Sequence, residues 1–182
     1  MKQRRSLRKM VLAALCLALT YVLPFLTGQI PQVGAMLAPM HLPVLLCGLL
    51  CGWYWGAAVG FVAPLLRSLT LGMPPLFPTA LCMTVELATY GAVAGLAYRL
   101  LPKKRGYLWV SLILAQLMGR GVWGLASFLA VGLKPEAFGL SAFLGGAFLT
   151  AWPGILIQLI LIPAVVLLLR RFRLTDDGVA AP

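Results

Sequence analysis

Acidic residues are scarce in this sequence, and histidine is nearly absent. The 182 residues include four Asp and Glu together and one His, and Glu86 is the sole acid within a long apolar stretch. Acid–base catalysis, metal-assisted phosphotransfer and Ser/His proteolysis each need several convergent titratable groups. The sequence therefore speaks against a membrane enzyme. It also lacks a Gly-x-x-x-x-Gly-Lys-Ser/Thr phosphate loop, so the chain does not itself use ATP.

Cysteine offers no metal site either. The cysteines all fall within apolar stretches, where a thiol behaves as a small hydrophobic group; they are Cys16, Cys47, Cys51 and Cys82. Cys47 and Cys51 are one helical turn apart, but zinc and iron need a fuller ligand set than these and His41 supply. We expect no structural disulfide, no bound metal and no cofactor.

Apolar residues make up most of the chain, and the basic residues are grouped. Hydrophobic residues account for 62% of the sequence and charged residues for 10%, a composition typical of an all-α integral membrane protein. Twelve of the 15 Lys and Arg lie at residues 2–9, 99–105 and 170–173. Basic residues beside membrane segments stay in the cytoplasm, so both termini should be cytoplasmic. Lipid headgroups and this orientation rule account for the net charge of +11, without nucleic acid.

This charge pattern predicts one domain, residues 1–182, that forms a bundle of six transmembrane helices. The predicted spans are 10–27, 41–54, 56–71, 79–100, 107–132 and 141–169. A single helix over 41–71 would give three membrane crossings before the second basic block and would place that block outside the cytoplasm. We therefore expect two helices with a break near Gly52, where a glycine permits a tight turn. The first apolar run is compatible with a signal peptide, but its length and the lack of a cleavage site favour a retained helix.

Charged and polar residues inside the predicted spans are the candidates for a ligand site. Ionisable groups at membrane depth are costly, and they usually line a cavity or pair with each other. Glu86 and Tyr90 share one helix face, and a polar stripe runs from Gln116 to Ser127. A kink is expected at Pro153-Gly154, beside Thr150 and Trp152. The predicted ligand-binding residues are Arg67, Glu86, Tyr90, Gln116, Arg120, Trp123 and Gln158.

The charge balance of these residues leaves two interpretations open. Glu86 could form a structural ion pair with Arg67 or Arg120. Two arginines against one glutamate leave a surplus positive charge, which favours an anionic ligand such as pantothenate or a folate. The aromatic residues would equally suit a flat ring such as pyridoxine or a thiamine pyrimidine. We interpret His41 as a helix cap or interface residue rather than a ligand contact.

Small residues recur at four-residue spacing on three predicted helices. The pairs are Ala14 with Ala18, Gly56 with Gly60, and Gly91 with Gly95. Such spacing lets membrane helices approach closely. Each pair either packs inside this bundle or docks against another membrane subunit.

The chain resembles the substrate-binding S components of energy-coupling factor (ECF) transporters. The resemblance lies in the basic amino terminus that runs into residues 10–18, and in six short-looped helices. The segments 42–52, 60–78, 86–95 and 119–124 also look like those of bacterial S components. In that family an Ala-x-x-x-Ala face of the first helix docks on the coupling subunit, and Ala14 and Ala18 match it here.

This resemblance implies vitamin import across the bacterial cytoplasmic membrane. The partners would be a transmembrane coupling subunit, two ABC ATPases and a small vitamin, with the ligand bound by helices four to six together with the first and third outer loops. Two other functions compete with it: a membrane scaffold of cell-envelope assembly, which needs no polar pocket, and a stand-alone ion-coupled carrier, whose coupling would have to rest on Glu86.

Overall fold

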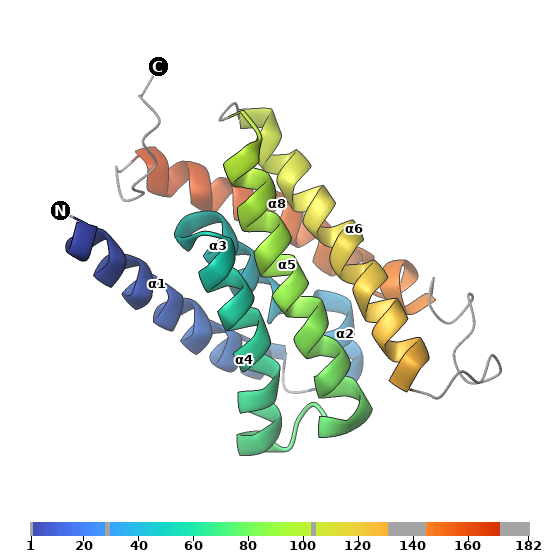
Figure 1. The fold of residues 1–182 in the computed structure, drawn as a ribbon. Coiled ribbons are helices and arrows are strands. Elements are labelled where there is room, and N and C mark those ends of the chain that lie inside the picture. Colours follow the sequence, from blue (N-terminus) through green and yellow to red (C-terminus); the bar gives the residue numbers. More distant parts are fainter. Residues whose placement is uncertain (1, 28–29, 103–104, 131–144, 172–182) are drawn as a thin grey trace.

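The chain folds into a bundle of helices in the computed structural model (Figure 1), which describes residues 2–27, 30–102, 105–130 and 145–171. The long helices are α1 (Lys2–Val22), α3 (His41–Cys51), α4 (Trp53–Leu71), α5 (Leu81–Leu100), α6 (Arg105–Ala130) and α8 (Trp152–Arg171). The short elements are η1 (Leu23–Thr27), α2 (Pro31–Leu37), η2 (Leu76–Ala80) and η3 (Gly145–Leu149). No strand occurs within these ranges, so the predicted all-α class is confirmed.

Helix α5 lies at the centre of the bundle. It packs against α3, α4 and α6, while α1 covers α3 and α4, and α8 contacts α2, α3 and α6. In Figure 1 the start of α1, the end of α5, the start of α6 and the end of α8 lie toward the upper part of the view, whereas the α4–η2 turn lies at the bottom. The described parts of the basic blocks therefore share one end of the molecule.

The outer surface of the bundle is apolar, as a lipid-facing surface must be. Large exposed hydrophobic side chains occur on every long helix except α3, whereas soluble monomers rarely expose contiguous apolar patches of this kind. Four helical segments are long and apolar enough to cross a membrane: Ser6–Leu26, Leu76–Leu100, Gly106–Ala130 and Trp152–Leu169. The shorter His41–Cys51 helix is also apolar. These features identify a multi-pass membrane protein, while the count of six spans and the cytoplasmic termini remain predictions.

Residues 41–71 form two helices that meet at Gly52. Helix α3 ends at Cys51 and α4 begins at Trp53, and Gly52 between them has φ of 103°. This backbone conformation is open to glycine and strained for other residues. The chain therefore turns back at the position where the charge pattern requires an additional helix.

Two sequence-based expectations differ from the structure. The sequence predicts no helix between the first two spans, at residues 28–40, yet Pro31–Leu37 forms α2, with a proline in its first turn. The break expected at Pro153-Gly154 lies slightly earlier, at residues 150–151 between η3 and α8, so Pro153 stands in the first turn of α8. A proline fits the first turn of a helix, where its missing N–H would have no partner in any case. Residues 131–132 and 141–144 of the last two predicted spans, and Arg173, lie outside the described residues.

A proline within α8 creates the contact that fastens this helix to α6. Pro163 has no N–H, so the carbonyl of Leu159 one turn earlier cannot make its usual helical hydrogen bond. The indole Nε1 of Trp109 on α6 donates to this carbonyl at 3.1 Å. The Leu159 carbonyl, which would otherwise lack a partner in an apolar region, thus accepts a hydrogen bond that joins α8 to α6.

Glycines allow α3, α4 and α5 to pack backbone to backbone. A Cβ at Gly91 would overlap the backbone of Gly56, one at Gly60 would overlap Leu87, and one at Gly95 would overlap the backbone of Trp53. The two glycine pairs therefore serve packing inside the bundle. They are not available to another subunit.

The glycine contacts predict a specific instability. Gly91→Ala should destabilise the protein by about 1–3 kcal/mol, because the added methyl group forces α4 and α5 apart. Thermal unfolding in detergent measures the effect. Gly121→Ala is the matched control, because Gly121 lies on α6 with nothing within 4 Å of an added Cβ. Equal melting temperatures for the two variants would contradict this account of the packing.

Candidate functional site

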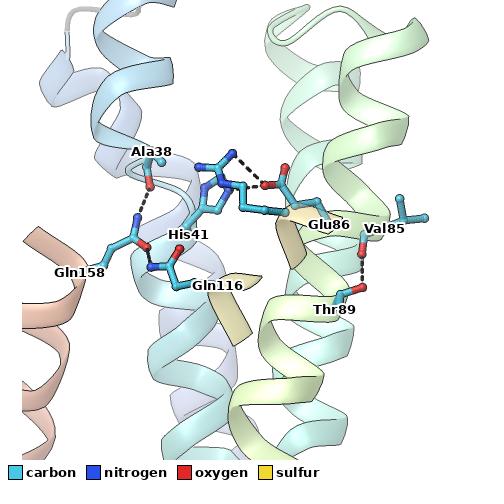
Figure 2. Close-up of polar contacts among 8 residues, drawn as sticks. Ala38, His41, Val85, Glu86, Thr89, Gln116 and Gln158 are labelled. Atoms are coloured by element: carbon cyan, nitrogen blue, oxygen red, sulfur yellow. Dashed lines mark hydrogen bonds and ion pairs between the residues drawn. The ribbon is translucent and has the colours of Figure 1, made fainter. Parts of the chain in front are cut away.

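Six buried polar side chains converge between α3, α5, α6 and α8. We call them the polar cluster: His41, Glu86, Tyr90, Gln116, Arg120 and Gln158. None is more than 7% exposed, although each comes from an otherwise apolar helix. Figure 2 shows His41, Glu86, Gln116 and Gln158 directed toward the same region from different helices, beside the carbonyl of Ala38.

Glu86 is the centre of the charged half of the cluster. Its Oε1 lies 3.2 Å from Nη1 of Arg120 and 3.3 Å from Nε2 of His41. The imidazole also meets the ring of Tyr90 edge-on, with the ring centroids 5.0 Å apart. Tyr90 lies one turn after Glu86, and its ring fills the space over Gly119, where a Cβ would come within 2.9 Å of three ring carbons. Glu86 therefore pairs with Arg120 and joins α3, α5 and α6.

Two glutamines form the uncharged half of the cluster. Gln116 Nε2 donates to Gln158 Oε1 at 2.7 Å, and Gln158 Nε2 donates to the carbonyl of Ala38 at 3.4 Å. Ala38 follows α2 and has φ of 45°, a conformation that turns the chain toward α3. Gln116 is also one turn before Arg120, so α6 carries both halves of the cluster.

The cluster has more hydrogen-bonding capacity than its own side chains use. Within the described ranges, the buried side-chain atoms that lack a hydrogen bond of acceptable geometry are His41 Nδ1, Tyr90 OH, Gln116 Oε1 and Arg120 Nε. All four belong to the polar cluster. Buried polar atoms in native proteins nearly always have a partner, and leaving one unsatisfied costs about 1–3 kcal/mol. Their concentration at one place marks it as a candidate ligand site.

The cluster lies deep in the bundle, away from the end that carries the basic blocks. At about 1.5 Å per helical residue, Glu86 is about 21 Å from Leu100, and Arg120 is about 22 Å from Arg105. By the same measure Gln158 is about 20 Å from Arg171. The hydrocarbon core of a bilayer is about 30 Å thick. The cluster thus lies past the middle of the membrane, if the basic ends mark one interface.

Arg67 lies apart from this cluster, although it is equally buried. Its Nη1 donates to the carbonyl of Tyr21 at 2.7 Å, and its guanidinium lies 5.2 Å from the centroid of the Phe25 ring. The Tyr21 hydroxyl also reaches Thr70 of α4 at 3.1 Å. Arg67 therefore caps the carboxyl end of α1, where unpaired carbonyls favour a cation.

The remaining predicted residues have distinct environments. Trp123 is half-buried one turn after Arg120, and its ring would contact a Cβ at Gly146 at 3.0 Å. Ser127 continues the buried stripe of α6, as expected. Ala14 and Ala18 are exposed on α1.

His41 was the residue that sequence reasoning undervalued. It is the first residue of α3, but it is buried and contacts Glu86, rather than lying at an interface. The signal was present, since an ionisable residue that opens an apolar run needs a partner at membrane depth. Glu86 was the one acid available to provide it.

The fold and the cluster define a multi-pass membrane protein with a polar site in its interior. Residues 8–166 match the family described as the ECF transporter substrate-specific component. The match covers most of the chain, and the protein belongs to this family of membrane subunits, which work with a transmembrane coupling subunit and ATPases. Searches of curated proteins and of solved structures gave no match.

The buried ion pair predicts a non-additive effect of mutation. Arg120→Gln should destabilise the protein by about 3–5 kcal/mol, because it leaves the Glu86 carboxylate buried without its main partner. The double variant Glu86→Gln/Arg120→Gln should recover most of this loss, because no buried charge remains unpaired. Thermal unfolding of the two single variants and the double variant measures the coupling. Additive losses would show that the two side chains do not act as a pair.

Proposed function

We propose that this chain captures a water-soluble vitamin or related micronutrient for an ECF-type importer, and that the polar cluster is where the solute binds. The observation that carries the proposal is the group of four unpartnered atoms on His41, Tyr90, Gln116 and Arg120. A solute that bonds to them would satisfy groups that are costly to bury alone. Family membership supports a substrate-binding role for the chain.

The position of the cluster supports capture from the outer side. If the basic ends face the cytoplasm, the cluster lies nearer the opposite surface. The α2 helix and the 72–80 segment, which connects α4 with α5, belong to that end of the molecule (Figure 1). These elements would cover the solute, while partner ATPases supply the energy for its release into the cytoplasm.

The exposed face of α1 supports a docking role for Ala14 and Ala18. The glycine pairs of α4 and α5 are used for packing within the bundle. The alanine pair, in contrast, is exposed, and Val11 and Leu15 beside it are each more than half exposed. Small residues at this spacing would let a helix of the coupling subunit approach closely.

The first functional prediction concerns Arg120. Protein that is gently extracted from its own membranes should retain a small molecule, which native mass spectrometry can detect and identify. Arg120→Ala should weaken binding of that molecule at least tenfold, or about 1.4 kcal/mol. Arg67→Ala is the matched control, because Arg67 is buried but contacts α1 instead of the cluster.

Binding that is equally strong in Arg120→Ala and the wild-type protein would contradict the proposed site. If the chain acts as a scaffold, no solute should bind and both arginine variants should behave alike. Transport that persists after deletion of every partner ATPase would indicate a stand-alone carrier instead.

The second functional prediction separates binding from transport. Ala14→Leu should leave solute binding unchanged but reduce uptake by cells at least tenfold, because the larger side chain blocks close approach of the coupling subunit. Ala164→Leu is the control, because Ala164 is exposed on α8 instead. Uptake by Ala14→Leu at the wild-type rate would argue against docking through this face.

A further inference from the structure

We infer that the part of the solute held by the polar cluster carries no net charge and offers at least two hydrogen-bond donors. This inference rests on the proposed function and adds the chemical class of the solute. It follows from three features of the cluster. These are its charge balance, the direction of the amide chain, by which we mean the hydrogen bonds from Gln116 to Gln158 and from Gln158 to Ala38, and the atoms that remain unpartnered.

With His41 as the neutral imidazole, the charges of the described cluster residues cancel. Glu86 and Arg120 supply one charge of each sign, 3.2 Å apart. The second arginine that would have created a positive surplus is Arg67, which bonds to Tyr21 and lies over Phe25. The surplus positive charge that would favour an anionic ligand therefore lies at the end of α1, outside the polar cluster.

An anionic solute would also have to compete with Glu86. To reach Arg120 it would bring a second negative charge close to the buried Glu86 carboxylate. Like charges at a shared buried site disfavour each other strongly. An uncharged solute avoids this cost and leaves the existing ion pair intact.

The amide chain fixes which atom of Gln116 faces the solute. The carbonyl of Ala38 can only accept a hydrogen bond, so Gln158 must turn its NH₂ toward it. The oxygen of Gln158 then accepts from the NH₂ of Gln116. Gln116 Oε1 remains, and it is an acceptor that requires a donor from the solute.

His41 provides a second acceptor by the same reasoning. The Glu86 carboxylate accepts a hydrogen bond from Nε2–H of His41, so the neutral imidazole has its lone pair at Nδ1. Arg120 Nε is a donor, and the Tyr90 hydroxyl can act either way. The complement of this set is a solute with two or more N–H or O–H donors and at least one acceptor, such as an amide or an amino- or hydroxyl-bearing ring.

Matched pairs of solutes test the inference. Nicotinamide and nicotinate, and pantothenol and pantothenate, differ mainly in charge and little in size. The compound that the protein retains through extraction, paired with a derivative of altered charge, joins this panel. Calorimetry in detergent measures the affinity for both members of each pair. In any pair that binds, we expect the uncharged member to bind at least tenfold more tightly than the anionic member. Tighter binding of the anionic member would overturn the inference and leave solute capture standing.

A charge variant makes the test specific to the cluster. Glu86→Gln leaves Arg120 without its counterion, so selectivity within the pair should shift at least tenfold toward the anion. Arg67→Gln should leave selectivity unchanged. Gln116→Leu is a second variant that keeps the ion pair, and it should weaken binding of the uncharged member at least tenfold. Unchanged selectivity in Glu86→Gln, together with unchanged affinity in Gln116→Leu, would overturn the assignment.

Failure of the proposed function gives a different result. In that case the folded protein would retain no solute from its own membranes, and it would bind neither member of any pair. Charge selectivity of either sign, by contrast, requires that a solute binds.

Discussion

A carboxylate buried among apolar helices determines how this molecule is arranged. Glu86 cannot remain charged in a low-dielectric interior without partners, and it finds them in Arg120 of α6 and His41 of α3. Each partner comes from a different helix, so one charge fixes the relative positions of three helices. The atoms that this arrangement leaves unpartnered all belong to the polar cluster, which links the stability of the bundle to the presence of a polar site.

The bundle is held together differently on its two sides. On one side, glycines let α3, α4 and α5 meet through their backbones. On the other side, α8 packs through the buried Ile162 and Val166 and adds hydrogen bonds between helices: Trp109 donates to the carbonyl that Pro163 leaves open, and Gln158 links Gln116 to Ala38. The polar cluster lies at the junction of these two sides. A solute that bonds to Gln116 would thus contact the chain of bonds that holds α8.

The sequence predicted much of the fold, because membrane burial imposes strong rules on composition and charge. Two helices over residues 41–71 were needed to keep the second basic block on the cytoplasmic side. The structure has two helices there, separated at Gly52, which has a positive φ. The period of the α6 stripe correctly placed Gln116, Arg120 and Ser127 on the buried face. Side-chain contacts between helices were harder to predict, because the spacing of residues along one helix does not say which neighbouring helix a side chain faces. Arg67 and Arg120 looked equivalent in sequence, yet they bond to different partners, and His41 gained its significance only from its contact with Glu86.

A structure of the extracted protein with its retained molecule tests most directly whether the polar cluster holds a solute. We expect density for the molecule between α3, α5, α6 and α8, with polar atoms at hydrogen-bond distance from Gln116 Oε1 and Arg120 Nε. Density for the molecule elsewhere, with these atoms bonded to other protein groups, would contradict the account.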